Sequence, residues 1–200
     1  MRLMIIAGGM RYPSGSRLAA DFVRQKVLEN KIFDQIDLLD LGQNPLPMWD
    51  EGVWRGEEKW KQILTPLRER MQVADAYVLV SPEYNGMASP AIKNFSLFFD
   101  ERATGHKPAL IVSVTSETHN GQYPVADLHA FGAKNTKWVY IPDHLIYRNI
   151  KGLINENLQM TNTLLEERTL FSLQELRLYA EAMKEVRNRH TFRPEFKYAP

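Results

Sequence analysis

The 200-residue chain contains no cysteine, which excludes disulfide bonds, thiolate catalysis and cysteine-ligated metal sites. It also lacks any apolar run approaching the roughly 20 residues that a membrane-spanning helix needs. Its charges nearly balance, with 25 Lys and Arg against 24 Asp and Glu, so bulk electrostatics predicts no binding to nucleic acid or membranes. The apolar stretch at residues 3–7 is too short for a signal peptide and is typical of a first strand. These absences predict a cytoplasmic protein.

The chain instead alternates short apolar runs with segments of helical spacing. Apolar runs bounded by turn residues indicate buried strands, whereas apolar residues three or four apart indicate helices. We expect strands at residues 3–7, 36–41, 76–81, 108–114 and 137–141, and helices at residues 17–30, 60–72, 89–102 and 125–132. Strand and helix alternate repeatedly, which predicts a parallel sheet covered by helices on both faces.

Some details of this pattern are specific enough to test. The helix at 17–30 should turn Leu18, Phe22, Val27 and Leu28 toward the sheet. Residues 42–58 should form a long loop. Pro66 should kink or break the helix at 60–72, because proline has no backbone N–H to donate.

The turn at residues 82–88 is the most informative part of the chain. Pro82 should end the preceding strand, because it removes a donor and biases the residue before it toward extended geometry. Ser89 can cap the next helix, with Pro90 at its first position. The loop therefore joins the carboxyl end of a strand to the amino end of a helix, where open α/β sheets bind ligands. A plain strand-to-helix turn is the alternative.

This stretch resembles the NADPH-dependent FMN reductase family in an ordered set of residues: Pro82, Glu83, Tyr84, Asn85, Pro90, Lys93 and Asn94. The resemblance covers about residues 3–145 and implies a flavodoxin-like three-layer α/β/α sandwich with strand order 2-1-3-4-5. It also implies FMN and NAD(P)H as cofactors, with the flavin ring held by this loop. Backbone N–H groups of Tyr84, Asn85 and Gly86 could then donate hydrogen bonds to flavin N5 and O4.

The loop at residues 8–17, GGMRYPSGS followed by Arg17, is the candidate phosphate site. Hydroxyls and free N–H groups meet there at a helix amino terminus, whose dipole favours an anion, and Arg11 adds a charged donor. The first serine of the family pattern is replaced by Gly9. The alternative is a solvated loop with an ordinary helix cap. The spacing is not GxGxxG, so a Rossmann dinucleotide site is disfavoured.

Two further loops depart from the family pattern or carry two interpretations. Residues 115–123, TSETHNGQY, stand where the family has a glycine-rich loop along the flavin, and Ser116 and Thr118 are the expected hydrogen-bond partners. His119 is a candidate proton donor or a solvated loop histidine. In the loop 42–58, Trp49 and Trp54 could line a subunit interface or, less favoured, a substrate wall.

The expected cofactor-binding residues are Gly9, Arg11, Ser14, Ser16, Arg17, Pro82, Glu83, Tyr84, Asn85, Gly86, Ser116 and Thr118. No protein residue is assigned a catalytic role, because the flavin carries the chemistry. His106, His129, His144 and His190 show no metal-ligand spacing, so no metal site is expected.

The favoured function is an FMN-dependent NAD(P)H oxidoreductase that reduces a quinone, azo compound, flavin or metal oxyanion. The resemblance implies a homodimer or homotetramer. One rival is a non-enzymatic flavodoxin-type electron carrier, although such carriers are strongly acidic and this chain has a net charge of +1. The other rival is a flavodoxin-like scaffold that has lost its cofactor, suggested by Gly9 and by the altered 115–123 loop.

The last quarter of the chain differs in character from the rest. We expect a flavodoxin-like domain at residues 1–148 and a helical extension of that domain at 149–200, with a polar helix over 155–189. The extension is too polar for a pair of core helices, so residues 170–200, including Phe192, Phe196 and Tyr198, are expected to reach over a neighbouring subunit.

Overall fold

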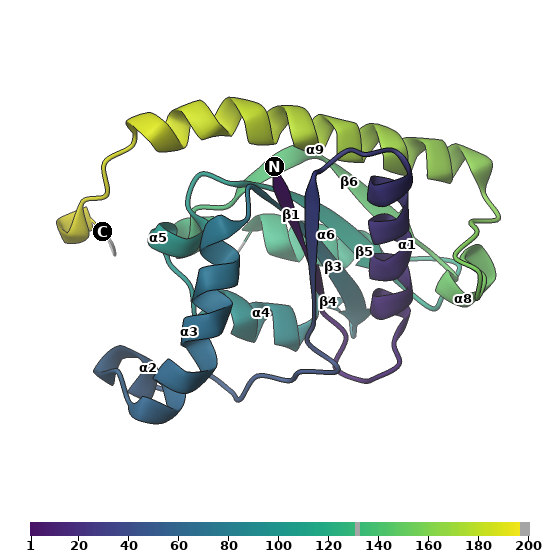
Figure 1. The fold of residues 1–200 in the computed structure, drawn as a ribbon. Helices are drawn as coiled ribbons and strands as arrows, with labels where there is room; N and C mark the ends of the chain where they lie inside the picture. Colours follow the sequence, from purple (N-terminus) through teal and green to yellow (C-terminus); the bar gives the residue numbers. More distant parts are fainter. Residues whose placement is uncertain (131–132, 197–200) are drawn as a thin grey trace.

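The computed structural model describes residues 1–130 and 133–196, and they form a parallel sheet between two helical layers (Figure 1). The strands are β1 (Arg2–Ala7), β2 (Gln35–Asp40), β3 (Ala76–Tyr84), β4 (Met87–Ala88), β5 (Pro108–Val114) and β6 (Val139–Tyr147). The helices are α1 (Gly15–Glu29), α2 (Gly52–Arg55), α3 (Glu58–Val73), α4 (Pro90–Ser96), α5 (Glu101–Thr104), α6 (Gln122–Ala130), α7 (Ala133–Thr136), α8 (Ile150–Leu153) and α9 (Thr163–Arg189), with a 3-10 turn at Pro194–Phe196.

The five long strands run parallel in the order β2-β1-β3-β5-β6. This is the predicted 2-1-3-4-5 order, because the short β4 pairs only with β3 and shifts the numbering by one. The flavodoxin-like fold is therefore confirmed. Predicted helix 125–132 is found as α6, although positions 131–132 lie outside the described residues.

Alternate residues of each central strand pack into two separate hydrophobic cores, one on each face of the sheet. One core joins the sheet to α1 and α9, and the other joins the opposite face to α3, α4 and α6. In β1, for example, Leu3 and Ile5 belong to the first core and Met4 and Ile6 to the second, all fully buried. Burial on both faces explains why this strand is a continuous apolar run. Among the described residues, no helix has the length and apolar character needed to cross a membrane.

The prediction that Pro82 ends its strand is wrong. β3 continues through Pro82 to Tyr84 and folds back on β4, with Glu83 opposite Ala88 and Tyr84 opposite Met87. Pairing of β3 with β1 ends at Val80, so Pro82 lies beyond the residues that hydrogen-bond β1. On that side of β3, the missing backbone N–H of Pro82 breaks no strand pairing. The strand therefore tolerates proline at this position.

Three helix predictions also need correction. The predicted break at Pro66 is wrong, because α3 continues through this residue, which is exposed, so the carbonyl left without a donor lies on the solvent side of the helix. The single helix expected at 89–102 is two helices, because Asp100 caps a new one by accepting from the backbone N–H of Arg102 at 3.1 Å. Leu28 is 58% exposed and points away from the sheet.

Two further segments differ from expectation. The loop 42–58 contains the short helix α2. The strand expected at 137–141 begins at Val139 and continues to Tyr147, with a register shift opposite Ala109 and Ile111. Pro142 lies on this edge strand beside the irregularity, where a missing donor is tolerated.

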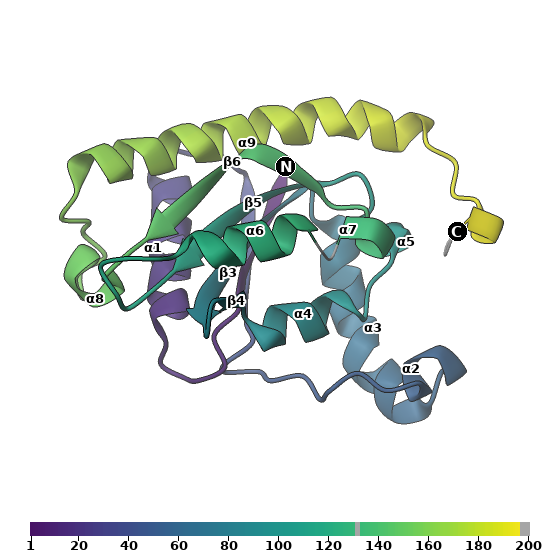
Figure 2. The same ribbon diagram turned by 180° about the vertical axis from the view of Figure 1, so that it is seen from behind.

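Helix α9 is the largest correction, because it packs on its own sheet and does not leave the body. Figures 1 and 2 show it as one long helix lying along the width of the molecule. Leu173, Leu176 and Ala180 are fully buried in the core that α9 shares with α1. Near its end, Arg187 pairs with Asp75 at 3.2 Å. Residues 170–189 are therefore part of this subunit, and predicted arm residue Tyr198 lies outside the described residues.

Candidate functional site

Three loops at one edge of the sheet form the candidate site. They span residues 8–14, 82–88 and 115–121 and lie at the carboxyl ends of β1, β3 and β5, which are adjacent strands. The carboxyl ends of parallel neighbours meet at one edge, so the topology brings these distant segments together. Figures 1 and 2 show the β1–α1 loop and the β4 hairpin on the same side of the molecule.

The first loop is built around two glycines and two serines. The backbone N–H of Gly8 donates to the Val80 carbonyl at 2.8 Å, which continues the ladder into the loop. A side chain at Gly9 would place its Cβ 2.5 Å from Ser14 Oγ and 3.2 Å from Ser16 Oγ. A side chain at position 9 would therefore have to displace Ser14, and the hydroxyls of this loop come from Ser14 and Ser16.

Ser14 and Ser16 have different roles at the amino end of α1. Ser14 Oγ accepts a hydrogen bond from the backbone N–H of Arg17 at 3.1 Å and caps the helix. Ser16 is 1% exposed, and its buried Oγ has no hydrogen-bond partner among the described residues. A buried hydroxyl without a partner is costly, so Ser16 is suited to bind a ligand at this helix terminus.

The two arginines of this loop are not equivalent. Arg17 Nε donates to Asp21 at 2.7 Å, and its NH1 lies 3.5 Å from Asp40. The hydrogen bond with Asp21 raises the pKa of Arg17 against the opposing effect of burial. Arg17 is thus engaged by carboxylates, whereas Arg11 is exposed on the loop and is the better candidate to meet an anion.

The second loop is a tight hairpin. Asn85 and Gly86 have φ values of 51° and 68°, the geometry of a two-residue turn with both central residues left-handed. Both residues are exposed. The Asn-Gly turn thus presents its backbone at the edge of the sheet where the ligand site is expected.

Side chains of this hairpin tie it to the other two loops. The Tyr84 hydroxyl accepts from the backbone N–H of Met10 at 3.4 Å, and Glu83 Oε2 accepts from the backbone N–H of Gly121 at 2.7 Å. The hydrogen bond of Glu83 fixes the turn and joins the second loop to the third.

Lys93 and Asn94 hold the surroundings of the hairpin. Lys93 pairs with Asp127 at 2.6 Å, and Asp127 also accepts from the backbone N–H of Ala88 at 2.9 Å. Asn94 donates to the Pro47 carbonyl at 2.9 Å and accepts from the backbone N–H of Trp49 at 2.8 Å. These residues were noticed as a sequence signature, but their partners lie too far away in sequence to be inferred from it.

The third loop is more exposed than the first two. Ser116, Thr118 and His119 are all exposed, so the sheet edge does not bury them. The loop is fixed instead by buried Thr115, whose Oγ1 accepts from the backbone N–H of Glu117 at 3.1 Å. Gly121 has φ 92°, and a side chain there would collide with Ile146. Sequence reasoning missed Thr115 as an organising residue.

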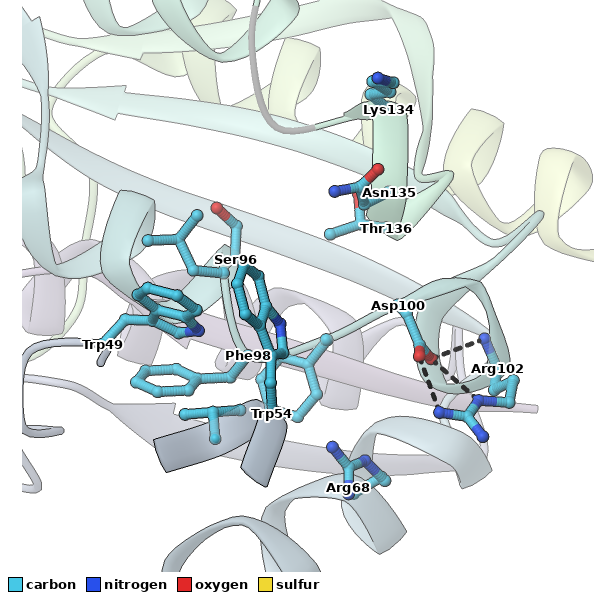
Figure 3. Close-up of a pocket in the computed structure, with 13 residues that line it drawn as sticks. Trp49, Trp54, Arg68, Ser96, Phe98, Asp100, Arg102, Lys134, Asn135 and Thr136 are labelled. Atoms are coloured by element: carbon cyan, nitrogen blue, oxygen red, sulfur yellow. Dashed lines mark hydrogen bonds and ion pairs between the residues drawn. The ribbon is translucent and has the colours of Figure 1, made fainter. Parts of the chain in front are cut away.

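A small cavity lies beside this edge, and a larger one lies away from it, at the far end of α4 and by α5. The small cavity, of about 210 Å³, lies between the first loop, the 41–48 segment and the start of α4, and is lined by Met10, Leu41, Pro45, Leu46, Met48, Pro90, Ala91 and Asn94. The other, of about 1100 Å³, lies by α2 and the end of α4 (Figure 3). Trp49 and Trp54 contact edge to face there, with ring centroids 4.7 Å apart. Figure 3 shows these rings and Phe98 together, with Lys134–Thr136 across the cavity.

Comparison with known proteins assigns the family. The model of the NADPH-dependent FMN reductases matches residues 1–151. The chain belongs to this family. It is 28% identical over 134 residues to an NADPH azoreductase from a Bacillus species, covering 65% of this chain and 67% of that protein. It is 30% identical over 95 residues to an FMN-dependent NADPH-azoreductase from Staphylococcus saprophyticus, covering 47% of this chain and only 50% of that protein.

The fold has a close structural counterpart. FerB, a flavoenzyme NAD(P)H:(acceptor) oxidoreductase from Paracoccus denitrificans, aligns with a TM-score of 0.74 over 91% of this chain and 98% of that chain. Its 15% identity supports the fold alone. Membership of the FMN reductase family confirms the expected cofactors, FMN and NAD(P)H, and an oxidoreductase as the class of enzyme.

The residues present at the family's phosphate position fit an FMN phosphate. Ser16 Oγ is buried without a partner among the described residues, and Gly9 leaves room that a Cβ would fill. The missing family serine at position 9 is therefore not a loss of hydroxyls, because Ser14 and Ser16 supply two. The structure thus argues against the scaffold rival at this loop.

Proposed function

We propose that this chain transfers two electrons from NAD(P)H to a planar conjugated acceptor of the quinone or azo type. When bound, FMN would supply the hydride chemistry, taking a hydride from the nicotinamide and passing it on. The meeting of the three loops beside a small, mostly apolar cavity is the observation that carries the proposal. A metal oxyanion or free flavin is a weaker candidate, because the lining favours a single apolar ring.

We assign the cofactor contacts as follows. Ser14, Ser16 and Arg11, with the amino end of α1, would hold the phosphate. The Asn85-Gly86 turn, flanked by Pro82, Glu83 and Tyr84, would hold the ring, with its N–H dipoles stabilising the negative charge of the reduced flavin. Ser116 and Thr118 would approach the ring from the third loop. Arg17 would position the loop through Asp21 and Asp40, without touching the phosphate.

The proposed acceptor class agrees with the names of two relatives, both azoreductases. Met10, Leu46 and Met48 come from two different loops and face one cavity. Methionine side chains adapt to varied flat surfaces, which suits an enzyme with several conjugated acceptors. Acceptor choice is thus proposed to depend on this cavity and not on a protein acid or base.

Purified protein tests the proposal in two steps. Flavin absorption and FMN titration come first, followed by steady-state NADPH oxidation with a benzoquinone, an azo dye, free FMN and chromate in parallel. We expect FMN-dependent turnover with the highest kcat/KM for the quinone or azo dye. Flavin binding without NADPH oxidation would support the electron carrier, and absence of FMN binding would support the cofactor-free scaffold.

A further inference from the structure

A group of metal-binding side chains lies at the opposite edge of the sheet from the three loops. Glu101 lies on α5, His106 precedes β5, and His190 follows the last residue of α9. One ligand atom from each lies within 4.8 Å of the others. His190 is distant from the other two in sequence, which is why spacing did not reveal the group. Figure 1 shows the end of α9 passing over the α5 side of the molecule.

The protein already holds these side chains close together. Glu101 Oε1 hydrogen-bonds His190 Nε2, and the rings of His106 and His190 have centroids 4.3 Å apart. The His106 backbone is fixed on both sides, because its N–H donates to the Lys137 carbonyl at 2.9 Å and its carbonyl accepts from Arg187 at 3.1 Å. Its φ of 55° is unusual for a residue with a side chain.

The imidazole of His106 provides an independent sign of a ligand. Its Nε2 is buried and has no hydrogen-bond partner among the described residues. A buried ring nitrogen without a partner costs free energy unless something binds it. One ring nitrogen of His106 lies within 4.8 Å of a Glu101 carboxylate oxygen and of a His190 ring nitrogen, and both of these partners are common metal ligands.

We propose that Glu101, His106 and His190 bind one divalent transition-metal ion, with Zn²⁺ as the best match. Two imidazoles and one carboxylate form a known zinc ligand set, with water as the fourth ligand. Zinc–ligand bonds are about 2.0–2.2 Å, so ligands within 4.8 Å of one another need only side-chain rotation to close around an ion. The metal would join the end of α9 to α5 and so stabilise the fold, at a distance from the flavin.

Two cations limit the affinity of this site. Lys137 Nζ lies 2.6 Å from Glu101 Oε2, and Arg187 is bonded to the His106 carbonyl. Their positive charges oppose a second cation, while Glu101 Oε1 remains directed at His190. Removing the Lys137 charge should therefore tighten metal binding, whereas removing a ligand should weaken it. This opposition of signs separates a metal site from a simple hydrogen-bonded cluster.

The test titrates untagged, FMN-loaded protein with Zn²⁺ alone, by calorimetry and by thermal melting. We expect one zinc per chain and a rise in Tm with zinc concentration. His190→Asn and Glu101→Gln should weaken binding by about 100-fold or more, since even residues behind metal ligands contribute 10- to 100-fold. Lys137→Met should tighten it. His144→Asn, an exposed histidine on β6, is the matched control and should change nothing.

A spectroscopic variant keeps the proposal testable if an asparagine variant fails to fold. The chain has no cysteine, so His190→Cys introduces a unique thiol. With Co²⁺ this variant should show a thiolate-to-metal absorption band that the wild-type protein lacks. The proposal is overturned if wild-type protein shows no saturable zinc binding, or if His144→Asn weakens it as much as His190→Asn. Absence of the cobalt band in folded His190→Cys would overturn it as well.

Discussion

The hydroxyl of Ser16 is expected to bind the cofactor without stabilising the cofactor-free protein. Its Oγ is buried and lacks a partner among the described residues. Ser16→Ala should therefore leave the stability of the cofactor-free protein unchanged or slightly higher. It should weaken FMN binding by about 10- to 100-fold, because a hydrogen bond to a charged group contributes about 1.5–3 kcal/mol. FMN titration and urea unfolding of the same samples measure the two effects.

Ser14→Ala is the comparison variant for Ser16. Ser14 caps α1, so its loss should destabilise the cofactor-free protein by about 0.5–2 kcal/mol. Equal stability losses in both variants would show that Ser16 has a structural role instead. Unchanged FMN affinity in Ser16→Ala would place the phosphate elsewhere.

Lys107 is a second residue with an unusual environment. It is 6% exposed, and its Nζ donates to the carbonyls of Met71, Gln72 and Ala103 at 2.7, 2.8 and 2.9 Å. Burial lowers the pKa of Lys107 to about 7. Between that pKa and the ordinary lysine value, the unfolded chain binds a proton that the folded chain lacks. The free energy of unfolding should therefore rise with pH above 7, by at most about 1.4 kcal/mol per pH unit.

Lys107→Met isolates this contribution. The variant should be less stable at pH 7, because the carbonyls at the end of α3 lose their donor. It should also show a smaller rise in stability between pH 7 and 9 than the wild type. Urea unfolding across that range, with exposed Lys61→Met as control, measures both effects. Parallel pH profiles for wild type and Lys107→Met would contradict the assigned pKa.

At the scale of elements, α9 is attached to β6 through a buried carboxylate. Asp143 is 6% exposed and accepts hydrogen bonds from Ser172 Oγ at 2.6 Å and from Arg168. Burial raises the pKa of Asp143, but these hydrogen bonds outweigh it and hold the pKa below its ordinary value. The stability that Asp143 contributes is present above the ordinary carboxyl pKa and is lost as pH falls through the lowered value.

Asp143→Asn should cost about 2–3 kcal/mol at pH 7, because Ser172 and Arg168 lose a charged acceptor. Glu185→Gln on the same helix breaks an exposed pair with Arg189 and should cost less than about 0.5 kcal/mol. Hydrogen exchange should show α9 amides opening more often only in Asp143→Asn. Equal unfolding midpoints for the two variants would mean that α9 is held by its apolar contacts alone.

The strands β1 and β5 and the helix α9 show where sequence reasoning succeeds and where it fails. β1 and β5 were found at or near their true bounds, because strands buried on both faces are continuous apolar runs. α9 was judged too polar for the core, yet Thr169 and Ser172 are fully buried. Their hydroxyls bond to Tyr147, to Asp143 and to carbonyls one turn earlier. Such hydroxyls satisfy their own turn and their partners lie on β6, so hydrophobic spacing cannot show their burial.

The candidate site was only partly predictable for a similar reason. Ser89 as a helix cap and the loops at 8–14 and 82–88 followed from local turn chemistry. The Asn85-Gly86 pair is an equally local signal for a hairpin turn. The prediction that Pro82 ends the strand took precedence over this signal and was wrong. The hydrogen bonds of Glu83 and Asn94 join segments about 40 residues apart, and no local pattern encodes them.

At the scale of the whole molecule, one face carries apolar side chains that a monomer leaves in water. Met48 is 74% exposed, Trp54 is 70% exposed and Leu97 is 59% exposed, and the last two line the larger cavity. Large aromatic side chains at such exposure are typical of interfaces. We therefore expect an oligomer formed through the 48–54 segment and the end of α4, not through the outer end of α9.

Sedimentation at micromolar concentration tests this expectation. The wild type should sediment as a multiple of the 23.2 kDa chain, and Trp54→Ser with Leu97→Gln should shift it toward the monomer. Leu164→Gln is the control, because Leu164 is 75% exposed on α9, outside that face. FMN binding should weaken in the double variant only if the neighbouring subunit completes the site, since neither residue belongs to the three loops. A clean monomer for the wild type would show that this apolar face has another occupant, and dissociation by Leu164→Gln would move the interface to α9.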